Sequence, residues 1–240
     1  MWRLTTIARI VAAGFMALAA TGAGAASLQV SPVTVDIPPP GAAAAVTLRN
    51  TGSRPLSAQI RVVRWTQEGG ADRFTPATEV VASPPAATMG PGQDYAVRII
   101  RLDKTPVAKE TAYRLLVDEL PDPAAQTNGA VALVVRYSIP VFFNGPEAAQ
   151  PRLAWSIDRR GGRLTAVARN DGGRRLRIAK LRVKDGGRVV SVGDGLAGYV
   201  LAGATMRFVA PAGAPGVGGR AAISAETDLG PLDATASGDR

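Results

Sequence analysis

Cysteine and histidine are absent from this sequence of 240 residues, and aromatic residues make up only 5% of it. Without cysteine, the chain can form neither disulfide bonds nor thiolate metal sites. Without histidine, it lacks the most common general base, the Ser-His-Asp arrangement and histidine metal ligands. The carboxylates are scattered, and the neighbours Asp118 and Glu119 should point to opposite faces of a strand. We therefore expect a protein that is not an enzyme and that uses no cofactor and no metal.

Long hydrophobic runs are also missing after the start of the chain. There, Arg3 and Arg9 precede an apolar run over residues 10–20, which is well short of the roughly 20 residues that span a bilayer. The small-residue stretch TGAGAAS follows, and this combination is typical of a secretory signal peptide. We expect residues 1–26 to be removed and the remaining chain to act in a bacterial periplasm, without stable insertion into a membrane.

Positive charge is concentrated in the second half of the chain. Residues 27–149 contain 11 Lys and Arg against 11 Asp and Glu, whereas residues 150–240 contain 15 against 8. Two interpretations stay open: this half binds an acidic partner or an anionic surface, or it is the solvated exterior of a basic protein. Nucleic acid is not an expected partner, because base stacking needs aromatic rings among the cations, and this half offers only Trp155, Tyr199 and Phe208.

Short apolar runs separated by Gly and Pro recur along the chain and predict an all-β fold. The runs cover residues 28–37, 44–50, 57–67, 95–103 and 112–120 in the first half, and 152–158, 164–170, 176–185, 198–203 and 223–227 in the second. The stretch NGPEAAQP between the halves resembles a linker. We expect one β-sandwich domain over residues 27–146 and a smaller, basic one over 150–232. The small, polar residues 233–240 are expected to form a disordered tail.

The stretch VALVVRYSIPVFFN, residues 131–144, has the period-two pattern of one long strand. One face would carry Val131, Leu133, Val135, Tyr137, Ile139, Val141 and Phe143. Pro140 lacks the amide that a central strand would donate, so it favours an edge position or a bulge. An exposed apolar edge is normally an aggregation hazard, which makes this stretch a candidate for pairing with a partner. An ordinary core strand remains the alternative, because periodicity alone does not distinguish the two.

Two further stretches, SPPAATMGPGQDYAVRIIR and KETAYRLLVDELP, carry a recognisable series of residues in a fixed order. The series is Pro84, Pro85, Pro91, Gly92, Val97, Arg98, Glu110, Tyr113, Glu119, Leu120 and Pro121. With a signal peptide before it and the strand over 131–143 after it, this series resembles the periplasmic chaperones of the chaperone-usher pilus pathway. The stretches RYSIPVF and RWTQ are more similar to its divergent archaic branch, which is associated with spore-coat-protein-U-like subunits.

The resemblance implies two immunoglobulin-like β-sandwiches arranged as a boomerang. It also implies that such a chaperone donates its strand over 131–143 to an incomplete pilus subunit, binds and stabilises it, and delivers it to an outer-membrane usher. The side chains expected to fill or approach the subunit groove are Val131, Leu133, Val135, Tyr137 and Ile139.

One departure from the family concerns the cations that hold the subunit's terminal carboxylate. At the positions that we align with these cations stand Pro32 and Pro140, which cannot bind a carboxylate. A replacement should come from cations in strands. The candidates are Arg136 and Arg98, with Arg61 and Arg64 as further possibilities. Two other classes stay open: a structural pilus subunit or adhesin-type sandwich, and a basic periplasmic module that binds anionic surface polymers.

Overall fold

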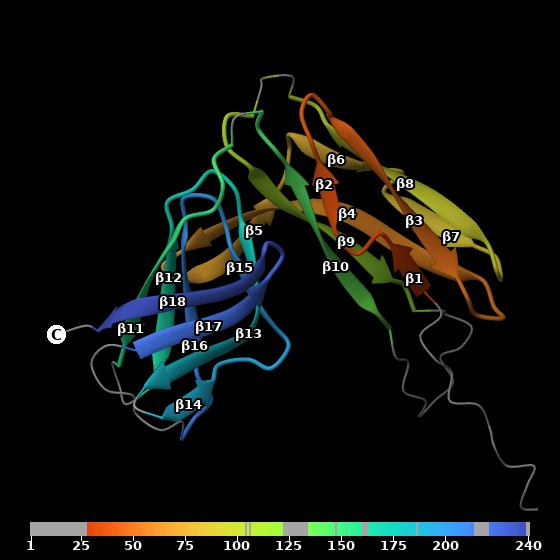
Figure 1. The fold of residues 1–240 in the computed structure, drawn as a ribbon. Helices are drawn as coiled ribbons and strands as arrows, with labels where there is room; N and C mark the ends of the chain where they lie inside the picture. The colour runs from red at the N-terminus through yellow and green to blue at the C-terminus, as the bar shows by residue number, and fades with distance from the viewer. Residues whose placement is uncertain are drawn as a thin grey trace, which may run out of the picture.

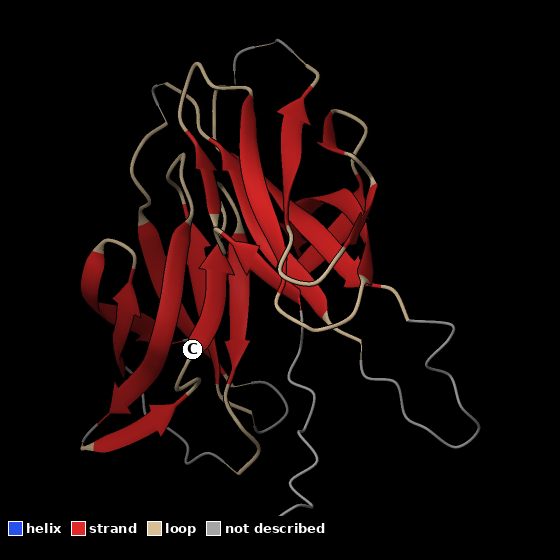
Figure 2. Ribbon diagram, turned by 90° about the vertical axis from the view of Figure 1, so that its right-hand side faces the viewer, coloured by secondary structure: helices blue, strands red, loops and turns tan. Residues whose placement is uncertain are grey.

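The computed structural model describes residues 28–103, 105, 107–121, 134–146, 148–159, 163–185, 187–213 and 221–238. These residues form two β-sandwiches that meet at an angle, like the two arms of a boomerang (Figure 1). Every regular element among them is a strand, as Figure 2 shows, so the expected all-β fold is confirmed. Accordingly, no segment of the described residues forms a helix long and apolar enough to cross a membrane.

The first sandwich consists of two facing sheets. One sheet has the order β1-β3-β8-β6 and is formed by Leu28–Ser31, Ala43–Asn50, Asp94–Arg101 and Val80–Ser83. The other has the order β2-β10-β9-β4-β5 and is formed by Val35–Ile37, Arg136–Phe143, Thr111–Glu119, Leu56–Glu68 and Ala71–Pro76. The short strand β7, Ala86–Met89, also pairs with β4. The run expected over residues 28–37 is thus split between the two sheets.

Alternation along these strands explains why they form a sandwich. In β4, for example, Ile60 and Val62 point into the core, whereas Arg61 between them is exposed. The same alternation in β3 buries Val46 and Leu48. Because successive side chains of a strand point to opposite faces, each sheet gains one apolar face, and the two apolar faces pack against each other.

The second sandwich is formed by the remaining strands, which run in the order β14-β13-β17-β18-β11-β12-β16, with β15 paired to β13. Their bounds are Leu153–Asp158 for β11, Thr165–Asn170 for β12, Leu176–Asp185 for β13, Arg188–Ser191 for β14, Leu196–Val200 for β15, Thr205–Val209 for β16, Ala221–Thr227 for β17 and Gly230–Gly238 for β18. Its core is separate from that of the first sandwich and includes Ile157, Ile178 and Leu181.

Residues 233–238 do not form part of the disordered tail expected over 233–240; the last two residues lie outside the described part of the chain. Residues 233–238 belong to β18, which pairs with β17 over residues 230–236 and with β11 over residues 237–238. Ala234 and Ala236 of this strand pack in the core, and Ala236 is fully buried. The expectation was wrong because small side chains give little apolar signal, although a strand between two neighbours can be held by its backbone hydrogen bonds.

Candidate functional site

The most unusual element of the first sandwich is β10, because one of its edges is largely open. β10 pairs with β9 along its whole length, from Arg136 to Phe143, but with β2 only over Val141–Phe143. Residues 136–140 therefore have no strand on their other side within the described part of the chain. The neighbouring edge of the opposite sheet is β1, and the Tyr137 hydroxyl donates to the Leu28 carbonyl at 2.6 Å, which ties the two edges together.

The hydrogen bonds of β10 show which backbone groups face this open edge. The amide of Glu119 donates to the carbonyl of Val135 at 3.0 Å, so odd-numbered residues of this segment face β9. Even-numbered residues consequently turn their backbone groups outwards, as the amide of Asn144 does when it donates to Ile37 of β2. Pro140 therefore stands where an outward amide would otherwise be, which agrees with its expected edge position.

The side chains of β10 divide between the core and the surface. Tyr137 is half-buried against the core, and Ile139 is only 3% exposed within it. Ile139 is therefore occupied by its own sandwich and has no free side chain to offer a partner. Before β10, Val134 is 50% exposed and Val135 is half-buried. Val131 and Leu133, the other expected donor residues, lie outside the described residues.

Two of the candidate anchor cations meet on one carboxylate beside the open edge. Arg61 Nη2 lies 2.8 Å from Asp118 Oδ2, and Arg136 Nε pairs with the other oxygen of the same group. The Asp118 side chain is 12% exposed, whereas those of Arg61 and Arg136 are 46% and 64% exposed. This face thus holds two exposed guanidinium groups against one nearly buried carboxylate, and it keeps an excess of positive charge.

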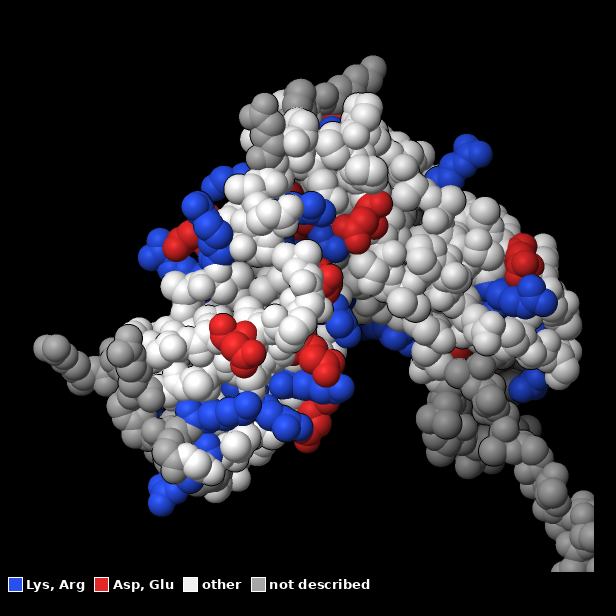
Figure 3. Space-filling model, viewed as in Figure 1, with Lys and Arg blue, Asp and Glu red and all other residues white. Residues whose placement is uncertain are grey.

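This cluster faces the second domain. Trp65 and Phe142 project from the same face of the sheet as Arg61 and Arg136, and they pack against Tyr199 of the second sandwich. The molecular surface is hollowed between the two sandwiches, next to this face (Figure 3). We call this hollow the cleft; its two walls are the outer face of β10-β9-β4 and the outer face of β13 and β15.

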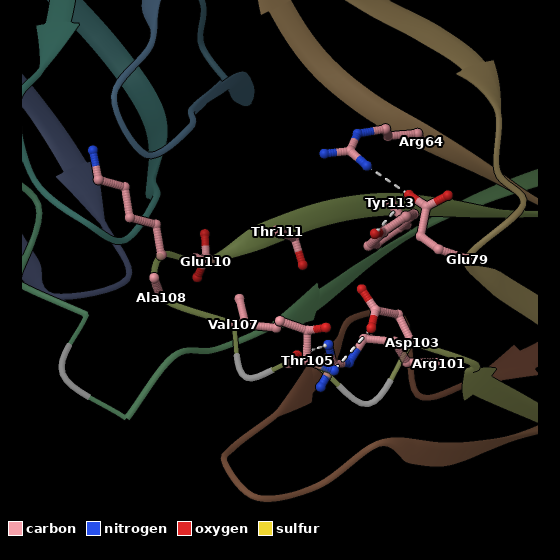
Figure 4. A pocket seen from close by; sticks show the side chains of 11 residues that line it. Arg64, Glu79, Arg101, Asp103, Thr105, Val107, Ala108, Glu110, Thr111 and Tyr113 are labelled. Carbon is pink, nitrogen blue, oxygen red and sulfur yellow. Dashed lines mark hydrogen bonds and ion pairs between the residues drawn. The ribbon is translucent and has the colours of Figure 1, made fainter.

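The other two candidate cations, Arg64 and Arg98, lie elsewhere. Arg98 is exposed on β8 of the opposite sheet. Arg64 points to the inner side of its sheet, where Nη1 pairs with Glu79 Oε1 at 2.6 Å. The Tyr113 hydroxyl donates to the same oxygen at 2.9 Å (Figure 4). The structure therefore brings Arg61 and Arg136 together, but not Arg64 and Arg98.

Glu79 and Tyr113 influence each other's ionisation. Partial burial favours the neutral form of Glu79, but hydrogen bonds from the backbone at residues 79 and 78, from Tyr113 and from Arg64 outweigh it and lower the pKa to about 2. Burial and the adjacent Glu79 carboxylate raise the pKa of Tyr113 to about 12. Both groups line an open pocket of about 450 Å³, together with Arg101, Thr105 and other residues (Figure 4). The Glu79 carboxylate is paired with Arg64 in the pocket wall, so we interpret this arrangement as structural.

A buried ion pair joins the two sandwiches. Arg175 Nη1 lies 2.6 Å from Glu110 Oε2, and Arg175 Nη2 lies 2.7 Å from Asp36 Oδ1. The Arg175 guanidinium also stacks on the Phe142 ring, 3.5 Å from its centroid. Burial raises the pKa of Glu110, against the opposing effect of Arg175. The sequence marked Glu110 only as a family motif residue and gave no sign of its partner.

The long β4-β5 hairpin extends this junction. The Gln67 amide group donates to the Tyr199 carbonyl at 2.8 Å and accepts from the Leu201 amide at 3.0 Å. At the hairpin tip, the amide of Arg207 donates to the carbonyl of Gly70 at 3.0 Å. Since ion pairs, aromatic packing and backbone hydrogen bonds all cross the boundary, the angle between the two walls of the cleft is firmly held.

Fold and site together define a two-sandwich protein that presents an open strand edge to the cleft between its domains. The family profile of the pili and flagellar-assembly chaperones, in its PapD N-terminal domain, matches residues 27–149. The chain therefore belongs to this family of chaperones, as the sequence motifs indicated. A search of the curated proteins found no match to the sequence.

Solved structures of such chaperones resemble most of the chain, across both sandwiches. The archaic Csu pilus chaperone CsuC of Acinetobacter baumannii, solved with the tip adhesion subunit CsuE, is 27% identical with a TM-score of 0.71; the match covers 90% of this chain and 100% of that one. The Salmonella enterica chaperone SafB, solved with the SafA pilin, is 18% identical over 89% of this chain and 98% of that one, with a TM-score of 0.61. The Pseudomonas aeruginosa chaperone CupB2 is 17% identical over 88% and 100%, with a TM-score of 0.58.

Proposed function

We propose that this protein is a periplasmic chaperone that captures pilus subunits by donating the strand over residues 131–143 and then delivers them to an outer-membrane usher. The observation that carries the proposal is the open edge of β10 beside the cleft. A subunit whose sandwich lacks one strand has an apolar groove with two unpaired edges. An edge strand that already points its backbone groups outwards can complete that groove.

Backbone hydrogen bonds would give such a complex its affinity, and side-chain pockets would set its register. The side chains that supply the apolar contact are Val131, Leu133 and Val135, which precede the part of β10 that packs in its own core. Each fully buried side chain of this size contributes about 1.5–3 kcal/mol before the cost of ordering is subtracted. Tyr137 and Ile139 then act from within the chaperone, because they hold the donor strand onto its own sandwich.

Arg136 and Arg61 are the proposed anchor for the subunit's terminal carboxylate. Both already bind a carboxylate, that of Asp118, and both remain exposed enough to bind a second one. A guanidinium can bind carboxylates along more than one edge, so the incoming group need not displace Asp118. Arg98 and Arg64 are less suited to this role, since Arg98 lies on the opposite sheet and Arg64 is paired with Glu79.

The route of the protein follows from the same proposal. The signal peptide over residues 1–26 would direct export, and capture would take place in the periplasm before delivery to the usher. Two relatives were solved in complexes with a tip adhesion subunit and with a pilin, which supports subunits of this kind as partners.

Capture can be tested by co-expressing the protein with the secreted subunit encoded by a neighbouring gene and purifying the complex. The wild type should form a soluble one-to-one complex, and Leu133→Asp should not. Leu229→Asp is the matched control, because Leu229 is an exposed apolar residue of the second sandwich, at 65% exposure, and should not affect capture. A subunit that is equally soluble without the protein, or a Leu133→Asp variant that still forms the complex, would refute the proposal.

A further inference from the structure

The outer face of β13 carries two exposed cations on one wall of the cleft. A bulge-like register shift between Ile178 and Arg182 changes the alternation of this strand. Beyond Ala179, Leu181 and Val183 are fully buried, and Arg182 and Lys184 are exposed on the other face. The two cations are two residues apart on one face of a strand, so their Cα atoms are about 6–7 Å apart.

The packing of Tyr199 shows that this face is turned towards the first sandwich. Tyr199 lies on β15, opposite Arg177 of β13, and its ring contacts Trp65 and Phe142 of the first domain. Paired residues on neighbouring strands project from the same face of a sheet. Arg182 and Lys184 follow Arg177 on that face, further from the junction. In the space-filling view, Lys and Arg side chains lie on this part of the second sandwich beside the cleft, with Asp and Glu side chains among them (Figure 3).

Neither cation forms an ion pair with the described residues, although the exposed Asp233 of β18 lies on the same face, two strands from Arg182. Lys180, just before them, pairs with Glu226 at 2.8 Å, but Arg182 and Lys184 form no ion pair with any residue that the structure describes. Their neighbours on β17 are small: Ser224 lies beside Arg182, and Ala222 lies beside Lys184. The small neighbours leave both charged groups accessible from the cleft.

Two unpaired like charges at this spacing repel each other and disfavour the folded chain slightly. Carboxylates from a partner would relieve this repulsion, and a guanidinium next to an ammonium group offers one bidentate and one point-charge contact. On the opposite wall, Arg61 and Arg136 share one carboxylate and leave an excess of positive charge as well. A partner seated in the cleft thus meets exposed cations on both walls.

We propose that Arg182 and Lys184 form a second recognition surface, which binds Asp and Glu side chains of the same subunit that β10 captures. This inference rests on the proposed function. It commits to a protein partner rather than an anionic bilayer, because a flat membrane does not fit the wall of a concave cleft. The subunit would be held by strand pairing on one wall and by charge on the other, and the charged contact would orient it and speed its association.

The test measures capture of the co-expressed neighbouring-gene subunit by charge-reversal variants. Arg182→Glu with Lys184→Glu should weaken the purified complex by about 5- to 30-fold, since two attractive surface contacts become repulsive. The affinity of the wild type should fall with added NaCl, and that of the double variant should fall less. Arg163→Glu is the charge control: this exposed residue precedes β12, which is separated from β13 by β17, β18 and β11 in the strand order. Arg163→Glu should leave the affinity for the subunit unchanged. Arg182→Glu alone should lower this affinity several-fold.

A second readout uses the absence of cysteine from the chain. A fluorophore on Arg182→Cys should be shielded from quencher when the subunit binds, and one on Arg163→Cys should not. Equal affinities of the Arg182 and Arg163 variants, or equal accessibility of the two labels, would overturn the inference while leaving capture by β10 intact. Binding of the wild type, but not of the double variant, to vesicles rich in anionic lipid with no effect on subunit capture would also overturn it. If the wild type captures no subunit at all, the proposed function itself fails.

Discussion

The guanidinium of Arg175 and the carboxylate of Glu110 lie 2.6 Å apart across the boundary between the two sandwiches, although 65 positions separate them in the sequence. Both side chains are buried, at 8% and 1% exposure. Glu110 directly precedes β9 of the first sandwich, and Arg175 directly precedes β13 of the second. Because the pair joins one strand from each sandwich, it fixes the angle at which the cleft opens.

Arg175→Met should therefore lower the free energy of unfolding by about 3–5 kcal/mol, because it leaves the Glu110 carboxylate buried without its partner. Urea denaturation of the purified protein measures this loss. The double variant Arg175→Met with Glu110→Gln should recover part of it, since no buried charge then remains unpaired. Equal stability of Arg175→Met and the wild type would show that the pair contributes nothing to the junction.

Glu79 should make the stability of the protein depend on pH in acid. Its folded pKa of about 2 lies below the ordinary value of 4.5. The folded state therefore binds this proton less readily than the unfolded state, and the stabilisation is complete above pH 4.5 and is lost as the pH falls towards 2. We expect a loss of about 1–2 kcal/mol over this window, after allowing for solvent screening at this partly open site.

The measurement is urea denaturation of the wild type and of Glu79→Gln between pH 6 and pH 2, which brackets the window of this shift. The difference between the two proteins should be largest at pH 6 and should shrink in acid. Taking the difference removes the contribution of Glu110, whose raised pKa acts in the opposite sense. A difference that stays constant over the whole range would exclude this role for Glu79.

Val135 and Ile139 should respond differently to the same substitution. Ile139→Asp places a charge in the core of the first sandwich, so we expect it to unfold or aggregate. Val135→Asp changes a half-buried residue before β10 and should leave the free protein folded but unable to capture a subunit. Thermal denaturation and co-purification distinguish the two effects. If Val135→Asp also unfolds the free protein, this residue belongs to a closed core and is not a donor.

Arg136→Ala should weaken subunit capture by a few kcal/mol at most, and Arg136→Lys should recover only part of the loss, because an ammonium group cannot make the bidentate contact. Competitive capture of a subunit with an intact or an amidated C-terminus measures the effect. Amidation should weaken binding to the wild type and have little further effect on Arg136→Ala. If amidation of the subunit does not lower its affinity for the wild type, the carboxylate anchor does not exist.

Much of the fold could be predicted from local patterns. The alternation in residues 44–50 and 57–67 identified β3 and β4, because a strand with one buried face carries apolar residues at every second position. The same rule failed for β18, where Ala234 and Ala236 are too small to mark an apolar face. The rule also placed Ile139 on the same face as the expected donor residues Val131, Leu133 and Val135. It did not reveal that the Ile139 side chain is buried in its own sandwich.

The site was predictable only in part, because its contacts join distant segments. The sequence marked Arg61 and Arg136 as separate candidate cations, but their meeting on Asp118 depends on the pairing of three strands. Nothing in the sequence linked Arg175 to Glu110, or Gln67 to the backbone of β15 and the residue after it. Patterns of period two report which side of a strand is buried, and they carry no information on which strands become neighbours.

The short length of the open edge of β10 limits what can remain bound to it. Pro140 provides no outward amide, and β2 covers the three residues that follow, so a strand added beside β10 itself can form only a few backbone hydrogen bonds. Two copies of this chain that met only along β10 would therefore be held together by few bonds. Only a subunit whose own pockets add apolar contacts would stay bound for long. The protein can therefore discriminate between subunits, although backbone hydrogen bonds carry no sequence information.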